Sequence, residues 1–388
     1  MGLLHTARRS ALAAALAVGA VLSGTSAPAA AATPGSVISV TAQPDGWHGM
    51  SGGSVVDYWM TGSDGAPHRA SGALFLPEGT PPPDGWPILA YDHGSSGLGP
   101  GCGGMSQPER APFPAMQGRQ DQLLRRLVSQ GFAVVAPDYL GLGRFDTGPH
   151  PYLELRTEAT ATIDLVQAAR AAHPELSRTW AVFGASQGGQ AALGTAQLQA
   201  TYAPDLDFRG TIAVDPESDV EKVLPLAGPV IPTMSDTAAP MSFFVSILAG
   251  VRAARPEVHV DQYLTPLGRT VLDEVGGLCL DRIIERVAGL GIGQLLARPL
   301  SSEPIRAAYT DYLTVPVRGY DAPILLLVNA TDTVVPSPLH AALIAQFAAN
   351  DVDSETVFGT GQHTQLNPAM WTAVEAFLAR IRETPAER

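Results

Sequence analysis

Apolar residues gather in short runs along the chain, and the spacing of these runs changes near residue 87. Before it, residues 55–60 and 70–76 carry apolar runs broken by glycine and proline, a pattern typical of antiparallel strands. After it, short runs that are apolar throughout alternate with longer segments that are apolar on one helical face. The expected strands of this second part are residues 87–91, 132–136, 179–183, 210–214, 323–328 and 355–358. The expected helices are residues 121–129, 152–172, 188–202, 338–350 and 368–382. This alternation predicts an α/β fold, a mostly parallel central sheet with helices on both faces.

The alternation stops between residues 216 and 318. This stretch holds several prolines and apolar helical segments at 241–251 and 271–290, but no apolar run that predicts a buried strand. We therefore expect a helical cap, residues 216–318, inserted into one α/β domain that covers residues 33–388.

The first 32 residues have the composition of a secretory signal peptide. Arg8 and Arg9 precede an apolar run over residues 11–22, and the alanines at 30–32 offer a small-residue cleavage site. The run is too short to span a membrane. We expect cleavage near Ala32 and a secreted, extracellular protein, exported by the general route or by the twin-arginine route.

Charge and cysteine content narrow the function classes. The formal net charge of −13 argues against a nucleic acid as partner and suits a soluble secreted protein. Cys102 and Cys279 are the only cysteines, and in an exported protein they predict one disulfide, with two buried thiols as the alternative. Two single cysteines far apart give no metal-site spacing, so we expect no metal and no other cofactor.

The most informative motif is Gly184-Ala185-Ser186-Gln187-Gly188. An apolar strand runs into it and a helix of small residues follows it, which is the order that a nucleophile elbow requires. Residues 49–53 also match G-x-S-x-G, but a turn-like stretch precedes them and the apolar run comes only afterwards. We therefore expect Ser186 to be a nucleophile and Ser51 to be a loop residue.

A serine nucleophile needs a base to accept its proton and an acid to orient that base. With an elbow of this kind, the acid and then the histidine follow the serine along the chain. Asp332 follows the expected strand 323–328, and His363 follows the expected strand 355–358. Loops at the carboxyl ends of parallel strands carry the active sites of such sheets. We expect Ser186, Asp332 and His363 to converge there as a catalytic triad.

Each of these assignments has a purely structural alternative. Ser186 could mark only a tight turn, and Asp332 could cap a helix or a turn. Asp215 is the best rival acid because it also follows a strand. His340 is the other histidine after Asp332, but it falls within an expected helix.

The oxyanion formed during acyl transfer requires two N–H donors. The residue after the nucleophile, Gln187, is expected to supply one of them. The backbone N–H of Ser95 is expected to supply the other, from the turn after the strand at 87–91. We expect His93 to brace this turn and to take no part in proton transfer.

Taken together, these motifs resemble those of the α/β-hydrolases, and more narrowly those of the secretory lipases, which include yeast and exported actinobacterial members. The residues that carry the resemblance are the His93-Gly94 turn, residues 137–143, residues 150–152, the elbow at 184–189, residues 332–336 and His363. The similarity spans roughly residues 50–380. It implies a helical cap after the sixth strand of the hydrolase sheet and cleavage of carboxylic esters, including acylglycerols.

The expected function is therefore a secreted carboxylic ester hydrolase, a triacylglycerol lipase or a carboxylesterase, that works through an acyl-enzyme. Its partner is a small-molecule or lipid ester, with transient contact to a lipid interface, and a monomer is favoured. The apolar stretch 241–249 lines an acyl tunnel, forms a lid, or is simply the core of the cap. A serine peptidase on the same scaffold, or a binding protein that retains the fold, are the alternatives.

Overall fold

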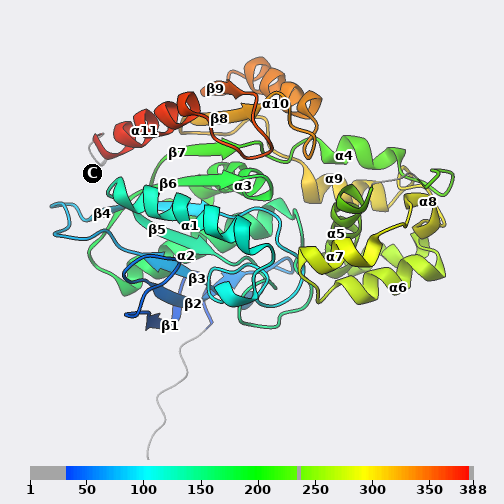
Figure 1. The fold of residues 1–388 in the computed structure, drawn as a ribbon, viewed down its shortest axis with the longest axis horizontal. Coiled ribbons are helices and arrows are strands. Elements are labelled where there is room, and N and C mark those ends of the chain that lie inside the picture. Colours follow the sequence, from blue (N-terminus) through cyan, green and yellow to red (C-terminus); the bar gives the residue numbers. More distant parts are fainter. Residues whose placement is uncertain (1–31, 234–236, 384–388) are drawn as a thin grey trace, which may run out of the picture. The chain divides into compact units, whose positions relative to one another are not determined.

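The computed structural model describes residues 32–233 and 237–383, which are built around one nine-stranded sheet (Figure 1). The strand order is β1-β2-β3-β5-β4-β6-β7-β8-β9. The strands are β1 Val37–Ala42, β2 Ser54–Thr61, β3 Pro67–Phe75, β4 Trp86–Asp92, β5 Ala133–Pro137, β6 Leu176–Ala185, β7 Asp207–Val214, β8 Ile324–Asn329 and β9 Ser354–Gly359. In this order, the neighbouring strands from β1 to β5 pair antiparallel, and the neighbouring strands from β5 to β9 pair parallel. The expected mostly parallel sheet is confirmed.

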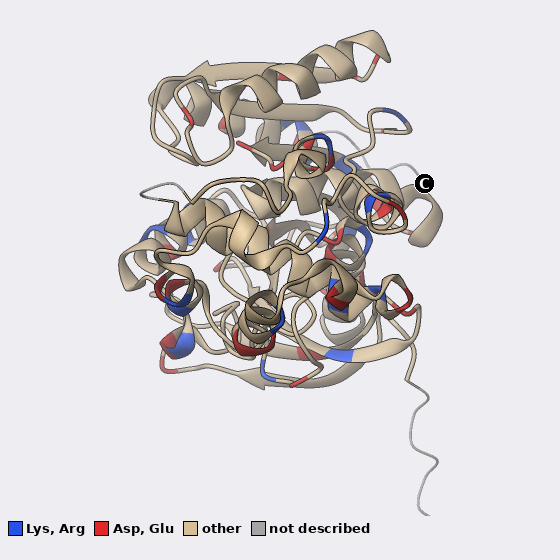
Figure 2. Ribbon diagram, turned by 90° about the vertical axis from the view of Figure 1, so that its right-hand side faces the viewer, with Lys and Arg blue, Asp and Glu red and all other residues tan. Residues whose placement is uncertain are grey.

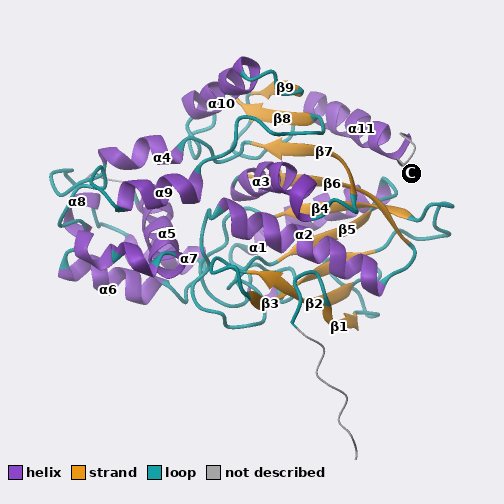
Figure 3. Ribbon diagram, turned by 180° about the vertical axis from the view of Figure 1, so that it is seen from behind, coloured by secondary structure: helices purple, strands orange, loops and turns teal. Residues whose placement is uncertain are grey.

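Helices cover both faces of the sheet (Figures 1 and 3). They are α1 Pro114–Ser129, α2 Leu155–Ala172, α3 Gln187–Tyr202, α10 Ser337–Ala349 and α11 Pro368–Glu383. The helices α2, α3 and α10 bury apolar side chains against one face, and α1 and α11 bury theirs against the other. Since β5 and β8 are covered on both sides, every residue in them is buried, which explains why their sequences are apolar throughout.

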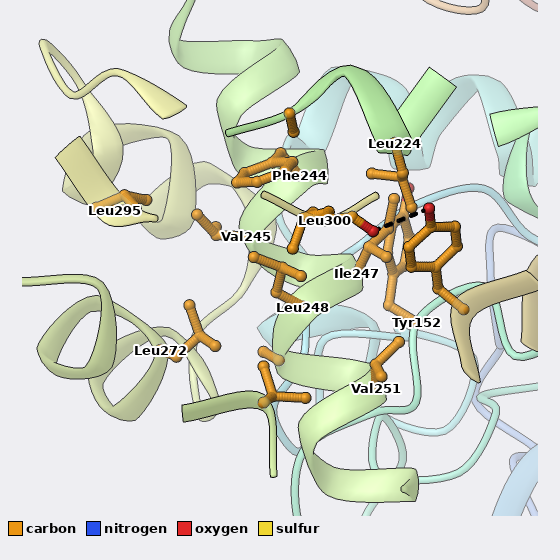
Figure 4. Packing of buried hydrophobic residues seen from close by; sticks show 14 of the residues in the cluster. Tyr152, Leu224, Phe244, Val245, Ile247, Leu248, Val251, Leu272, Leu295 and Leu300 are labelled. Carbon is orange, nitrogen blue, oxygen red and sulfur yellow. Dashed lines mark hydrogen bonds between the residues drawn. The ribbon is translucent and has the colours of Figure 1, made fainter. Parts of the chain in front are cut away.

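Between β7 and β8 the described residues form helices and no strand. These helices are α4 Val220–Val223, α5 Ala238–Ala254, α6 Pro266–Val275, α7 Leu280–Val287, α8 Ile292–Leu295 and α9 Ile305–Leu313. The segment forms its own apolar cluster around α5, where Val245, Ile247 and Leu248 are packed (Figure 4). Of the alternatives for residues 241–249, the structure favours the core of the cap.

One expected element of this region is wrong. The apolar stretch 271–290 forms two helices, α6 and α7, instead of one. The Gly276-Gly277 pair that separates them has low helix propensity, and the residues after it pair with another part of the chain. The helix expected from residue 152 also begins later, at Leu155, because Leu153 adopts a left-handed conformation with a φ of 63°.

The cap is tied to the loop that follows β4. Cys102 and Cys279 form a disulfide with a Cα–Cα distance of 5.3 Å, which confirms the predicted pairing. Two backbone hydrogen bonds accompany it, from Leu98 N–H to Leu278 O (2.9 Å) and from Leu280 N–H to Ser96 O (2.9 Å). Gly97 lies opposite Cys279, and a Cβ at Gly97 would stand 2.6 Å from the Cys279 Cα. This close approach requires glycine.

Charged residues of both signs are interspersed along the ribbon (Figure 2). Some of them link cap and sheet domain: Arg255, after α5, donates to Glu154, which precedes α2, at 2.6 Å. Within the described ranges, no helix is both long enough and apolar enough to cross a bilayer. The predicted signal peptide, except for its last residue, lies outside the described residues.

Candidate active site

The backbone at Ser186 has the geometry of a nucleophile elbow. The strand β6 ends at Ala185 and α3 begins at Gln187, so Ser186 is the single residue between them. Its φ of 59° and ψ of −124° lie in a region that is sparsely populated by non-glycine residues, and such conformations concentrate at functional sites. A Cβ at Gly184 would stand 1.8 Å from Gly188 O, and one at Gly188 would stand 1.9 Å from Asp92 O. Only glycine fits at either position.

The structure brings the three predicted catalytic side chains into one hydrogen-bonded row. His363 Nε2 lies 2.8 Å from Ser186 Oγ, and His363 Nδ1 lies 2.5 Å from Asp332 Oδ2. Asp332 is in the loop after β8 and His363 is in the loop after β9, so both reach the serine from carboxyl ends of strands. This geometry allows the imidazole to accept the serine proton while the carboxylate fixes its tautomer.

Asp332 is buried, and hydrogen-bond donors contact both of its carboxylate oxygens. Its Oδ1 accepts hydrogen bonds from the N–H groups of Val334 (2.8 Å) and Val335 (3.2 Å). Its Oδ2 faces a second histidine besides His363, because His340 Nε2 lies 3.3 Å away. His340 is in α10, as the sequence predicts, but its side chain is buried against the acid of the row. This contact could not be predicted from the sequence.

Asp215, the rival acid, is buried behind the row and has a different set of partners. Its Oδ1 accepts the N–H of Asn329, and its Oδ2 accepts the Asn329 side-chain amide and the N–H of Thr364, each at 2.7 Å. Asp215 therefore connects the ends of β7 and β8 to the residue after His363. Its contacts position the loop that carries the histidine.

Asp215, Asp332 and His340 have ligand atoms within 4.8 Å of one another, the spacing of a metal site. However, N–H donors already occupy the carboxylate oxygens, and His340 directs Nε2 at Asp332. The cluster is therefore a hydrogen-bond network that holds the loops after β8 and β9 in place.

Gln187 begins α3, so its backbone N–H is one of those that have no acceptor within the helix. Its side chain donates to Glu158 Oε1 at 2.6 Å and lies 2.8 Å from His150 Nε2. Burial raises the pKa of Glu158 well above its ordinary value and lowers the pKa of His150 to about 3. This buried, uncharged trio fixes the position of Gln187. In the sequence, His150 stands out only as part of the family resemblance, and nothing marks Glu158.

The turn that contains Ser95 lies against the elbow, since a Cβ at Gly94 would stand 3.6 Å from the Ser186 Cβ. The Ser95 hydroxyl is 2.7 Å from the Tyr152 hydroxyl. His93 is buried in the same turn, with Nδ1 2.8 Å from Gly94 O and its ring packed on Tyr139. The turn is thus held close to the nucleophile on several sides.

A family model described as secretory lipase matches residues 111–289, which include the elbow. Over these residues the chain is similar to the secretory lipases. A comparison with curated protein sequences finds no match. The family match ends before Asp332 and His363, so the placement of these residues rests on the structure alone.

The similarity to solved structures extends over nearly the whole chain. Candida antarctica lipase A in its closed state has 17% identity and a TM-score of 0.71, with 92% of this chain and 84% of that chain covered. The rice cell wall degrading esterase LipA of Xanthomonas oryzae has 19% identity and a TM-score of 0.68, with 90% and 98% covered. A putative hydrolase of Legionella pneumophila has 19% identity and a TM-score of 0.67, with 87% and 90% covered. At these identities the matches show the shared fold.

One further acid lies beside Ser186, and the sequence does not predict it. Glu217 follows β7, is buried, and accepts a hydrogen bond from the Tyr152 hydroxyl at 3.2 Å. Burial raises the pKa of Glu217 to about 7, while the nearby His363 and hydrogen bonds from Tyr152 and Ser186 act in the opposite direction. Its place directly after Asp215 and Pro216, at the end of a predicted strand, was the only signal in the sequence.

Ser51, the other serine in a G-x-S-x-G pattern, lies in an exposed bend before β2. Its hydroxyl donates to Glu78 Oε1 at 3.2 Å. Ser51 thus contacts a carboxylate oxygen, whereas Ser186 contacts an imidazole, so the two matches to one pattern differ in chemistry.

Proposed function

We propose that this protein is a secreted serine hydrolase of carboxylic esters, a lipase or carboxylesterase. The observation that carries the proposal is the hydrogen-bonded row of Ser186, His363 and Asp332 at the elbow. The match to the secretory-lipase model supports an ester substrate, as do the two neighbours of the same fold that are described as a lipase and an esterase.

In this proposal His363 Nε2 accepts the Ser186 proton as Oγ attacks the ester carbonyl. The negative charge that develops on the carbonyl oxygen is stabilised by the N–H groups of Gln187 and Ser95. The imidazolium then protonates the departing alkoxide, which leaves as an alcohol and gives the acyl-enzyme. His363 next removes a proton from water, hydroxide attacks the acyl carbon, and Ser186 is released with its proton restored.

Export and contact with lipid are part of the same proposal. The predicted signal peptide supports export, and the Cys102–Cys279 disulfide fits an oxidising compartment. Leu226 and Val230, in the cap after α4, are 74% and 89% exposed. These apolar side chains support transient contact with an apolar substrate surface.

The proposal is tested by initial rates on p-nitrophenyl esters from acetate to palmitate. Ser186→Ala is expected to lower kcat by about 10⁶, the order of loss seen when a triad nucleophile is removed. Ser51→Ala is the matched control, because Ser51 stands in the same sequence pattern without an imidazole partner, and it should retain the rate. A rate maximum at long acyl chains indicates a lipase, and a maximum at short chains indicates an esterase.

Full activity in Ser186→Ala would refute the assignment of the nucleophile. Absence of hydrolysis across the whole series, with the protein folded, would refute the ester-hydrolase proposal.

A further inference from the structure

A second carboxyl group lies at the nucleophile, outside the row of Ser186, His363 and Asp332. Glu217 is 7% exposed and belongs to the segment directly after β7. This segment packs on the elbow, since the Glu217 backbone N–H donates to Ser186 O at 3.4 Å and a Cβ at Gly189 would stand 2.9 Å from the Pro216 Cα. The backbone therefore holds the glutamate beside the serine.

The Glu217 side chain also lies within a polar row of its own. Tyr152 donates to Glu217 Oε1 at 3.2 Å, and the Tyr152 hydroxyl is 2.7 Å from the Ser95 hydroxyl. The row runs from the segment after β7 to the turn that carries the proposed oxyanion donor. The Ser186 side chain also influences the Glu217 carboxyl and, like Tyr152, lowers its pKa.

A serine hydroxyl has one proton to donate, and two acceptors stand near the Ser186 hydroxyl. A hydrogen bond to His363 Nε2 prepares transfer of that proton to the base. A hydrogen bond to an ionised Glu217 directs the proton away from the base and leaves the serine unactivated. A neutral Glu217 is a weaker acceptor and carries a proton that it can itself donate.

We propose that Glu217 controls the direction of the Ser186 proton, so that the enzyme works with Glu217 protonated and loses activity when Glu217 ionises. The inference rests on the proposed function, in which Ser186 is the nucleophile. This effect involves no covalent change, because ionisation of Glu217 only releases a proton to solvent.

The groups that face Glu217 set the pH range of this control. Burial raises the pKa of Glu217 to about 7, and the negative charge of Asp332 acts in the same direction. A positive charge on His363 and the hydrogen bonds from Tyr152 and Ser186 lower it. Glu158, on α2, is also electrostatically coupled to Glu217, and its own burial favours its neutral form. Glu217 therefore changes charge near neutral pH.

The experiment measures kcat between pH 5 and pH 9.5, together with the rate at which a fluorophosphonate labels Ser186. In the native enzyme both rates are expected to fall at alkaline pH, by about tenfold for each pH unit well above the midpoint. Glu217→Gln, which keeps the shape but cannot ionise, is expected to lose this alkaline fall. Tyr152→Phe should move the fall to higher pH, because the lost hydrogen bond favours the ionised carboxylate.

Glu221→Gln is the matched control, because Glu221 is a second buried glutamate of raised pKa only four residues away, on α4. With Glu221→Gln, both rates should still fall at alkaline pH. An unchanged alkaline fall in both Glu217→Gln and Tyr152→Phe would overturn the inference. Failure of the proposed function can be told apart from failure of this inference. Labelling of Ser186 without ester hydrolysis would reject the ester substrate, and the pH dependence of labelling would still test the role of Glu217.

Discussion

Two buried aspartates at the end of this sheet show that the role of an aspartate depends on which groups donate hydrogen bonds to its carboxylate. Asp332 and Asp215 both follow parallel strands, so the sequence offers no firm choice between them. In the structure both aspartates accept two backbone N–H groups, but Asp332 also contacts the His363 imidazole, whereas Asp215 also accepts the Asn329 side-chain amide. The first arrangement suits a triad acid and the second suits a structural anchor.

At this scale we predict different losses for the two isosteric substitutions. Asp332→Asn should lower kcat by about 10⁴, because an amide favours the wrong tautomer of His363. Asp215→Asn should lower the free energy of unfolding by roughly 1.5–3 kcal/mol, since it weakens hydrogen bonds to a charged group, with a much smaller loss of kcat. Steady-state rates and urea unfolding of both variants check this. A larger kcat loss in Asp215→Asn would reverse the two roles.

At the scale of elements, the turn that supplies the proposed oxyanion donor is attached to the cap. Backbone hydrogen bonds pair residues 96–98 with 278–280, and the Cys102–Cys279 disulfide lies beside this pairing. The position of the turn therefore depends on two parts of the chain that are distant in sequence. The same pairing explains why residues 271–290 do not form one helix, which local apolar spacing could not reveal.

We expect that removing the disulfide weakens catalysis as well as stability. The double variant Cys102→Ala/Cys279→Ala should lose up to about 5 kcal/mol of unfolding free energy, because the bridge closes a long loop in the unfolded chain. The loss in kcat should exceed the change in KM, since an oxyanion donor acts mainly on the transition state. Ester hydrolysis and urea unfolding measure the two effects.

Reduction of the native disulfide under mild conditions is the companion experiment, and it should reproduce the kinetic change. A variant that loses stability but keeps kcat would show that the hydrogen bonds alone hold the turn.

At the scale of the whole molecule, several carboxyl groups are buried, and the effect of burial on their pKa outweighs that of the hydrogen bonds they accept. Burial raises the pKa of Asp92 to about 8, of Asp164 to about 7 and of Asp138 to about 6. A carboxyl with a raised pKa in the folded state binds its proton more tightly there than in the unfolded chain. Its contribution to stability is complete below its ordinary pKa and is lost as the pH rises through the folded value.

The protein should therefore become less stable as the pH rises from about 5 to 9. Of these three acids, Asp92→Asn should reduce this dependence most, because Asp92 has the highest pKa and its Oδ2 has no hydrogen-bond partner among the described residues. Asp205→Asn, at an exposed position, is the control and should leave the dependence unchanged. Urea unfolding across this range measures the slope, and a stability that rises with pH would contradict the prediction.

The limits of sequence reasoning are clearest in the molecule as a whole. Alternating apolar runs predicted the sheet and its helices, because burial on both faces forces apolar residues at every position of a strand such as β8. The elbow was visible because its glycines are local requirements of the backbone. Glu217, His340 and Glu158 were not foreseen, since their importance comes from contacts with residues that lie 8 to 65 positions away. Such contacts exist only once the strands are in register.

The disulfide makes a covalent ring of the chain between Cys102 and Cys279, and this ring contains Ser186 but neither Asp332 nor His363. A protease that cuts the cap before Cys279 therefore opens the ring without separating the molecule. The resulting fragments stay linked, one carrying the nucleophile and the other the base and the acid. Nicked enzyme would be held together by the same bridge that joins the cap to the sheet domain, and would come apart covalently only on reduction.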